Sequence, residues 1–434
     1  MTDSAPKRSL RESLAVYLRP ESLRMFALGF AAGLPLLLTA GTLALRLREA
    51  GIDIDTIGFL SWVGLAYSFK WVWAPLVDRL PLPFLTRALG RRRGWLLLAQ
   101  VAVVAGLLGM AWTDPARHLP ALVGWALLVA FASATQDIAL DAFRIESAPV
   151  REQPALSASY QTGYRLAMIW AGAGALWLAA WAETGGAHGY QDAAWRVAYA
   201  IMAASMAVGA LTVLFSPEPA RVALAPTRGA RQWLEQALIE PFAEFFRRYH
   251  WHAALVLALI GLYRISDVVM GGMANPFYVD MGFNKEEIAT VSKIFGVAMT
   301  LAGTFVGGAL AMRLGVMRVL MGGAVASAAS NLLFAWLATR GHDLPALVAV
   351  VCADNLAGGI ASAAFVGYLS GLTNVRYSAT QYALFSSIAQ LLPKFIAGYS
   401  GVYVKAWGYP SFFIATALLG APVLLLVWMA QKKR

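Results

Sequence analysis

Twelve apolar stretches separated by short polar segments constrain the fold of this chain more than any other feature of its sequence. Each is long enough to cross a bilayer, which takes about 20 helical residues. Backbone groups in lipid must be hydrogen-bonded within their own segment, so each stretch is expected to form a helix. The sequence therefore predicts an all-α membrane protein with twelve transmembrane helices. The stretches lie near residues 25–47, 55–77, 94–113, 119–143, 154–181, 193–215, 251–279, 287–312, 316–338, 344–369, 377–404 and 408–430.

Composition supports this class. Charged residues make up 14% of the chain, against about 25% in soluble domains. The net charge of +11 would suit a nucleic-acid partner. However, the basic residues are spread over short loops, which the positive-inside rule explains better, so we expect no such partner. The single cysteine, Cys352, excludes an intramolecular disulfide and a cysteine metal site.

The loops define orientation and domains. A polar interval at 216–250 divides the stretches into six and six, and basic residues concentrate in the loops on the side of the N-terminus. We therefore predict a multi-pass membrane protein with both termini cytoplasmic. The predicted domains are an interfacial segment at 1–24, a six-helix bundle at 25–215, a cytoplasmic linker with interfacial helices at 216–250, a second bundle at 251–430 and a basic tail at 431–434.

Short segments after the first and the seventh stretch are similar to one another. At one constant offset they pair Gly51 with Gly282, Asp53 with Asn284, Asp55 with Glu286 and Ile57 with Ile288. In each copy an acidic residue precedes the next stretch, as a helix N-terminus prefers. The match predicts two six-helix bundles related by a pseudo-two-fold axis along the membrane normal.

Charges lie inside several apolar stretches, where they are costly and mark a functional site by default. At helical spacing Asp137, Asp141 and Arg144 share one face. Charged residues fall in the second, fourth, fifth, seventh, eighth, tenth and eleventh stretches, and none lies deep in the third, sixth, ninth or twelfth. This distribution predicts a polar path between selected helices. The other charges on it are Lys70, Arg165, Arg264, Asp267, Lys293, Asp354 and Lys394.

Three segments carry a family resemblance. Asp78-Arg79 is followed, after ten residues, by Gly-Arg-Arg-Arg-Gly at 90–94, and this loop resembles the cytoplasmic signature of the major facilitator superfamily. With residues 29–36 (Gly-Phe-Ala-Ala-Gly-Leu-Pro-Leu) and 135–143 (Thr-Gln-Asp-Ile-Ala-Leu-Asp-Ala-Phe), it resembles the AmpG-type muropeptide permeases. The resemblance implies the major facilitator fold and proton-driven import of anhydro-muropeptides, whose cytoplasmic fate bears on β-lactamase induction. It also implies that Asp78 helps to lock the two halves together.

Cations near the midplane suit an anionic substrate, and the planar fork of arginine suits carboxylates. Muropeptides carry several carboxylates and a sugar, which aromatic rings could face. We expect this small anionic glycopeptide to be the substrate of a monomeric protein that needs protons and lipid but no cofactor. The candidate substrate-binding residues are Arg165, Arg264, Gln136, Asp354, Asn355, Lys293, Lys394, Trp71, Tyr160 and Tyr263.

Proton coupling would need a membrane carboxylate, because all five histidines lie in loops or at helix ends. The candidates for coupling are Asp137, Asp141 and Asp354, with Lys70 as the counter-charge. The predicted cytoplasmic gate comprises Asp78, Arg79, Arg91, Arg92 and Arg144.

Other interpretations stay open. The intramembrane charges could be permanent ion pairs that only hold helices together. The protein could carry another organic anion, a siderophore or a peptide. The spacing of Asp137 and Asp141 also suits a metal-dependent transferase, although a second acidic cluster is missing from the sequence. A membrane sensor that transports nothing is the last alternative.

Overall fold

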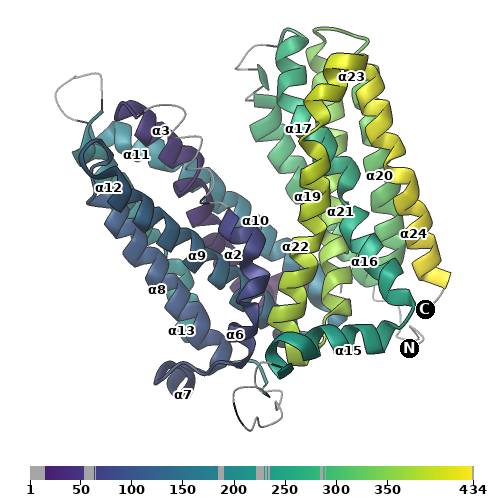
Figure 1. The fold of residues 1–434 in the computed structure, drawn as a ribbon. Helices are drawn as coiled ribbons and strands as arrows, with labels where there is room; N and C mark the ends of the chain where they lie inside the picture. The colour runs from purple at the N-terminus through teal and green to yellow at the C-terminus, as the bar shows by residue number, and fades with distance from the viewer. Residues whose placement is uncertain are drawn as a thin grey trace.

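The computed structural model describes residues 15–52, 63, 65–183, 190–220, 229, 232, 235–283, 287–288 and 290–432. Within these residues every regular element is a helix, and ten helical segments are long and apolar enough to cross a membrane. Figure 1 shows the helices in two groups that lie side by side. The all-α membrane class is confirmed, whereas the domain bounds from the sequence stay predictions.

The first group contains the elements before the linker. They are η1 (Val16–Leu18), α2 (Pro20–Leu38), α3 (Gly41–Glu49), α5 (Leu65–Phe69), η3 (Lys70–Val72), α6 (Ala74–Arg79), α7 (Leu85–Leu89), α8 (Arg91–Ala111), α9 (Pro115–Ser147), η4 (Val150–Glu152), α10 (Gln153–Ile169), η5 (Trp170–Gly174), α11 (Ala175–Ala182), α12 (Asp192–Ser205) and α13 (Ala207–Phe215). We call this group the N-terminal half.

The second group, with the linker helix α15, is called the C-terminal half below. Its elements are η6 (Glu235–Ile239), α15 (Glu240–Tyr249), α16 (His252–Leu262), α17 (Ile265–Asp280), η7 (Thr290–Phe295), α19 (Gly296–Leu314), α20 (Val316–Leu337), α21 (Leu344–Leu372), η8 (Val375–Tyr377), α22 (Ser378–Ala397), α23 (Ser400–Leu418) and α24 (Gly420–Lys432).

Two predicted stretches are not among the ten spanning segments. In the stretch at 55–77, residues 55–62 and 64 lie outside the described part of the chain. The stretch at 377–404 forms α22 and the first residues of α23. Within α23 the backbone of Gly408 is non-helical, with φ at +76°. That break falls between the predicted eleventh and twelfth helices.

Several predicted helices are interrupted, among them the first and the seventh. The first stops at Leu38 and resumes at Gly41, and the Thr39 hydroxyl donates to the carbonyl oxygen of Pro35 at 2.9 Å. Proline has no N–H to continue the helical bonds, so a break near it is expected. The seventh stretch is interrupted between α16 and α17, where Arg264 lies in a turn. Arg264 therefore lies outside the regular helix at a central position of its stretch.

Glycines set the closest helix contacts within each half. A Cβ at Gly29 would lie 2.2 Å from the carbonyl oxygen of Tyr160, so α2 and α10 touch backbone to backbone. A Cβ at Gly303 would lie equally close, 2.2 Å, to the carbonyl oxygen of Leu356, so α19 and α21 do the same. Small residues allow this approach in membrane bundles.

The two repeated segments begin with the same turn. Gly51 and Gly282 both have a positive φ, +81° and +87°. The residue after each glycine donates its N–H to the carbonyl oxygen four residues before the glycine, at 3.0 and 3.1 Å. This is the cap that glycine favours after a helix. The matching turns support the internal repeat, although residues 53–57 and 284–286 lie outside the described chain.

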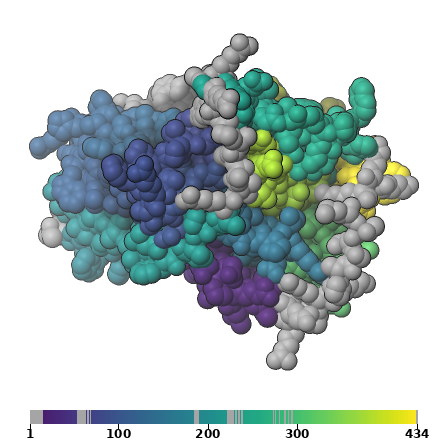
Figure 2. Space-filling model, turned by 90° about the horizontal axis from the view of Figure 1, so that it is seen from below, coloured from purple at the N-terminus to yellow at the C-terminus, as the bar shows by residue number. Residues whose placement is uncertain are grey.

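The halves meet at the end that the sequence predicts to be cytoplasmic. Here α22 packs against α6 and α9 of the N-terminal half, and α10 packs against α19 and α21. Seen from below, yellow-green residues lie between dark-blue residues of the N-terminal half and the teal linker region (Figure 2). The contacts at this end join segments that are far apart in the sequence.

Candidate functional site

Asp78, at the end of α6, joins the two halves directly. Its carboxylate accepts hydrogen bonds from Arg92 Nη2 at 2.7 Å, from the Thr380 N–H and hydroxyl, both at 2.7 Å, and from the Ala379 N–H at 3.2 Å. Ala379 and Thr380 lie in the first turn of α22. A carboxylate is favourable there because the helix N-terminus presents unpaired N–H groups and a positive dipole end. Asp78 of one half therefore caps a helix of the other.

Arg92 is the hub of this contact and is only 1% exposed. Besides Asp78, its Nη2 donates to Glu146 at 2.6 Å and to the Ser378 hydroxyl at 2.8 Å. The Ser378 hydroxyl in turn donates to Glu146 at 2.6 Å. A buried cation is tolerated when carboxylates pair with it, and breaking one such pair is strongly destabilising. We call Asp78, Arg92, Glu146, Ser378 and Thr380 the lock.

The start of α8 is held by an acidic residue that the sequence did not reveal. Glu218 accepts the N–H groups of Arg92 and Arg93 at 2.8 and 3.1 Å. Gly90 has φ at +94°, and a Cβ on it would lie 2.3 Å from the Glu218 side chain. Only glycine fits this turn without strain. The ten residues between Arg79 and Gly90 include α7 and do not keep the loop from reaching its partners.

Arg144 makes a second connection between the halves. Its guanidinium donates to Gln153 Oε1 at 2.7 Å and to the Ser370 hydroxyl of α21 at 3.0 Å. It also lies over the ring of Tyr382 on α22, 5.1 Å from the centroid. Asp141 pairs with it at 3.3 Å on its own helix. The structure therefore brings Arg144 to the predicted gate.

The remaining predicted gate residues lie at the same end. Arg91 donates to the backbone oxygen of Asp78 at 2.5 Å. Arg79 donates to Gln236 of the linker at 3.0 Å and lies over the ring of Tyr377 at 5.9 Å. Arg79 therefore links the N-terminal half to the linker and to the approach to α22.

A third contact involves the N-terminal segment. The Tyr17 hydroxyl donates to the carbonyl oxygen of Phe305 on α19 at 2.8 Å, and the two rings meet edge to face. Burial raises the pKa of Tyr17 above its ordinary value, so the hydroxyl stays a donor. The segment before α2 therefore packs against the C-terminal half.

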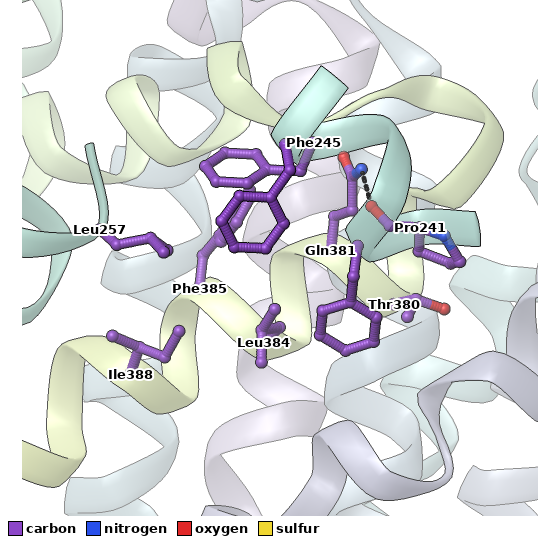
Figure 3. Close-up of a pocket in the computed structure, with 10 residues that line it drawn as sticks. Pro241, Phe245, Leu257, Thr380, Gln381, Leu384, Phe385 and Ile388 are labelled. Carbon is purple, nitrogen blue, oxygen red and sulfur yellow. Dashed lines mark hydrogen bonds between the residues drawn. The ribbon is translucent and has the colours of Figure 1, made fainter. Parts of the chain in front are cut away.

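The linker helix α15 packs on the start of α22. Gln381 donates to Glu244 at 2.7 Å and to the carbonyl oxygen of Pro241 at 2.8 Å, the bond drawn in Figure 3. Beside this bond, an apolar cavity of about 170 Å³ lies among α15, α16 and α22. Thr380 of the lock is part of its wall (Figure 3). The linker is thus attached to the helix that Asp78 caps.

Asp137 and Asp141 of α9 lie near Lys70, which belongs to the second predicted stretch. Lys70 Nζ lies 4.0 Å from Asp141. Asp137, one turn away, is within electrostatic range of both Lys70 and Asp141. Its Oδ1 is buried and makes no hydrogen bond to the described residues. Lys70 therefore lies beside Asp141 and within electrostatic range of Asp137, and its role as their counter-charge stays a prediction.

Arg165 of α10 and Arg264, between α16 and α17, belong to different halves and are within electrostatic range of each other. They are close enough to repel one another electrostatically. Arg165 is partly buried and makes no hydrogen bond or ion pair with any residue that the structure describes. Arg264 pairs with Asp267 at 3.0 Å and donates to the Ser362 hydroxyl. Of these two arginines, only Arg264 forms an ion pair with a described carboxylate, that of Asp267.

Asp354 and Asn355 of α21 are engaged inside the C-terminal half. Asp354 accepts the Ser330 hydroxyl of α20 at 2.9 Å. Asn355 accepts the Thr300 hydroxyl of α19 at 2.8 Å and donates to its own helix. Both are partly buried. Their polar atoms hold neighbouring helices, so the structure gives less support to their predicted contact with substrate.

Two predicted substrate contacts need correction. Gln136 is 0% exposed, and neither polar atom of its side chain has a hydrogen-bond partner among the described residues. Tyr263 is 5% exposed, its hydroxyl donates to the carbonyl oxygen of Leu320 at 2.9 Å, and its ring stacks on Phe365. Both side chains are core residues and are not available to a ligand in this conformation.

The other predicted residues divide into two sets. Trp71 and Tyr160 pack against the apolar cluster that includes Ala379 and Ala383 of α22. Lys394 is exposed near the end of α22. The side chain of Lys293 lies outside the described part of the structure. The structure therefore leaves Arg165 and Arg264 as the central pair.

Sequence reasoning missed Glu146, Ser378 and Thr380. Glu146 follows Arg144 by two residues, so a search for an acid near the predicted gate would have found it. Ser378 and Thr380 carry no such signal, because hydroxyl residues are common at helix starts. Among the described residues, no three His, Cys, Asp or Glu side chains come together as a metal site would require.

Comparison with known proteins agrees with this geometry. Residues 25–266 match the family model of the Major Facilitator Superfamily. The anhydromuropeptide permease of Escherichia coli (strain K12) is 35% identical over 421 residues, which cover 96% of this chain and 81% of the relative. The putative transporter AmpG 4 of Rickettsia felis is 35% identical over 94% of this chain and 96% of its own.

Solved structures of low sequence identity share the fold. The transporter FucP in the outward conformation has a TM-score of 0.69 at 15% identity, covering 95% of this chain and 99% of its own. The human organic anion transporter MFSD10 has a TM-score of 0.63 at 15% identity, covering 97% and 100%. The enzymatic alternative is therefore discarded. The family model spans more than half of the chain and the relatives are 35% identical over most of their length, so the chain belongs to the AmpG-type permeases of the major facilitator superfamily and is a multi-pass membrane transporter.

Proposed function

We propose that the protein imports anhydro-muropeptides from the periplasm into the cytoplasm, by alternating access and together with protons. The observation that carries the proposal is the pair of arginines, one from each half, of which Arg165 has no counter-ion among the described residues. The 35% identity to an anhydromuropeptide permease supports the choice of substrate.

The arginine pair suits a substrate with more than one carboxylate. Each guanidinium can bind a carboxylate through two parallel hydrogen bonds. Arg165 and Arg264 repel each other when the site holds no anion, and a bound anion relieves this repulsion. Because the two arginines belong to different halves, a ligand that bridges them would couple binding to the approach of the halves.

The lock bears on the direction of access. It holds α22 to α6 and α8 at the predicted cytoplasmic end, so in this conformation the arginine pair would be reached from the other side. Binding of substrate and proton would then have to favour a second conformation in which the lock is broken.

Coupling is assigned to the carboxylates beside Lys70. Asp141 pairs with both Lys70 and Arg144, whereas Asp137 lies only within electrostatic range of Lys70 and its Oδ1 makes no hydrogen bond to the described residues. Asp137 is therefore the carboxylate of the two that a proton can neutralise more readily. Protonation of Asp137 would leave Lys70 to pair with Asp141 alone. The proton gradient is then the only energy source required and no cofactor takes part. We place the protein in the inner membrane as a monomer with both termini cytoplasmic.

Counterflow in proteoliposomes tests the substrate. Vesicles loaded with unlabelled anhydro-muropeptide should take up the labelled compound without any gradient, and an imposed inward proton gradient should drive accumulation. Arg165→Gln should abolish both. Arg313→Gln, at an exposed arginine at the end of α19, is the matched control and should transport normally.

Competitors separate the remaining alternatives. The competitors would be an anhydro-muropeptide, a peptide without the sugar, a simple dicarboxylate and a ferric siderophore. Each would be added at about 0.1 mM, which lies in the range of typical enzyme KM values. Strong inhibition by the siderophore or the dicarboxylate alone would reassign the substrate to another organic anion. Absence of any counterflow in the wild-type protein would contradict the proposed function.

A further inference from the structure

Of the buried side-chain atoms in the described N-terminal half that have no hydrogen-bond partner, three belong to one group of neighbouring residues. They are the Tyr67 hydroxyl of α5, the Ser133 hydroxyl of α9 and Oδ1 of Asp137, also on α9. Ser133 is 0% exposed, so it is shielded from the solvent around the molecule. Leaving one such group without a partner costs about 1–3 kcal/mol. Three such atoms in neighbouring residues therefore indicate that something else, such as water, satisfies them.

The three groups form one cluster. Ser133 and Asp137 are four residues apart on α9 and share a face of the helix. The Tyr67 hydroxyl approaches Ser133 and Thr39 and is within electrostatic range of Asp137. Thr39 lies where α2 stops, and its hydroxyl donates to Pro35, so its oxygen can still accept. The cluster thus joins α2, α5 and α9.

The cluster extends from the carboxylate toward the side opposite the lock. Along α9, Ser133 lies one turn farther from the lock end than Asp137, and Asp141 lies one turn nearer to it. Thr39 is at the far end of α2 from the lock. The polar groups therefore form a line that runs from Asp137 toward the face from which substrate would enter.

Every element around Asp137 contributes a group that bears on its charge. Lys70 of η3 attracts a proton-free carboxylate, and Asp141 of α9 repels it. Tyr160 and Tyr164 of α10 and Tyr67 of α5 are within electrostatic range as well. Of these groups, only the Tyr67 hydroxyl both lacks a hydrogen-bond partner among the described residues and lies near Ser133.

The cluster also borders the arginine pair. Tyr164 is within electrostatic range of Asp137, of Tyr67 and of its neighbour Arg165. A carboxylate that binds to Arg165 would therefore change the electrostatic environment of the cluster. This gives a physical route by which substrate and proton can affect one another.

We propose that Tyr67 and Ser133, together with ordered water, form the relay that brings the coupling proton to Asp137 from the substrate side. The proposal rests on the proton-coupled transport proposed above. Buried polar groups without a protein partner are commonly satisfied by water with two to four hydrogen bonds. Tyr67 and Ser133 are positioning residues, because they orient the water and do not keep the proton.

The transfer balances without ionising either hydroxyl. A hydronium on the entry side gives its proton to the first bridging water. Each hydroxyl accepts one proton from the group before it in the line and gives its own proton to the group after it. The last proton forms an O–H bond with Oδ1 of Asp137, which becomes a neutral carboxyl group, and the entry water is left neutral.

The test compares gradient-driven uptake with counterflow for Tyr67→Phe and Ser133→Ala in proteoliposomes. Both changes remove one oxygen that makes no bond to the described residues, so the fold should be kept. We expect counterflow to stay near the wild-type rate and gradient-driven uptake to fall at least about tenfold, since positioned proton-transfer groups typically contribute about 100-fold or more. A pH-sensitive dye should show a matching loss of substrate-induced proton uptake.

The controls remove comparable hydroxyls elsewhere. Tyr199→Phe removes a buried hydroxyl that donates to Leu38, and Thr212→Val removes one that donates to its own helix. Both should leave the ratio of driven uptake to counterflow unchanged. Wild-type ratios in Tyr67→Phe and Ser133→Ala would overturn the relay while leaving the proposed function intact. Wild-type counterflow without any response to the proton gradient would overturn both the coupling and the relay.

Discussion

Replacing Asp78 by asparagine should open the end of the protein that the lock closes. Asparagine has nearly the same shape but lacks the charge, and one of its two terminal groups is a donor. In the lock both carboxylate oxygens accept, one from Arg92 and Ala379 and the other from the N–H and hydroxyl of Thr380. The amide can therefore satisfy only one of these sides.

The size of the effect follows from these contacts. Removing one partner of a buried ion pair costs about 3–5 kcal/mol, which is roughly 100-fold to 4,000-fold in an equilibrium constant. Arg92 retains Glu146 at 2.6 Å in the variant. We therefore expect the equilibrium between the closed and the open lock to shift by about 3 kcal/mol, the lower end of that range, toward the open conformation.

Double electron–electron resonance can measure this shift. Nitroxide labels at Ala88→Cys and Arg318→Cys would report on exposed positions of α7 and α20, one in each half, in a Cys352→Ala background. In the unmodified lock we expect one dominant distance. With Asp78→Asn, a longer distance should appear as a substantial fraction.

Asp114→Asn is the matched control. Asp114 also caps a helix, since it accepts the N–H of Ala116 at 3.0 Å, but its contacts stay within the N-terminal half. It should leave the distance distribution unchanged. An unchanged distribution in Asp78→Asn as well would refute the claim that the lock holds the two halves together.

Three further changes follow from the structure. Glu244→Gln weakens the attachment of α15 to Gln381, by about 1–2 kcal/mol, and should shift the same label distance less than Asp78→Asn does. Arg46→Met removes a buried guanidinium that donates to Met110, Thr113 and Asp192, so the unfolding temperature in detergent should fall, with a free-energy loss of about 1–3 kcal/mol from the carbonyl groups left unpaired. Tyr263→Phe removes one bond inside the C-terminal half and should cost about 1 kcal/mol of stability without changing affinity for substrate in a binding titration.

The sequence predicted the helices well because apolar length is a local property. The break at Arg264 was not predicted, since a helix interruption without a proline depends on which neighbours satisfy the released backbone groups. Asp78 was recognised as a gate residue from its loop. Its partner Thr380 was not, because the contact joins residues about 300 positions apart that only the folded halves bring together.

The candidate site was predicted in part. Arg165 and Arg264 were identified because charges are conspicuous in apolar stretches, and the structure brings them within range of one another. Gln136 was placed at the site as the neighbour of Asp137, yet adjacent residues of a helix point about 100° apart, and Gln136 is buried. Tyr67 and Ser133 gave no sequence signal, because hydroxyl side chains are common in membrane helices.

The most direct test of the central claim is a binding titration of the purified protein with an anhydro-muropeptide and with the same molecule after amidation of its carboxylates. The account predicts that the wild-type protein prefers the carboxylate form by at least about tenfold, as expected for one charge-assisted pair. It also predicts that Arg165→Gln removes this preference while Arg313→Gln retains it. Equal affinity of the wild-type protein for both forms would contradict the assignment of the arginine pair as the substrate site.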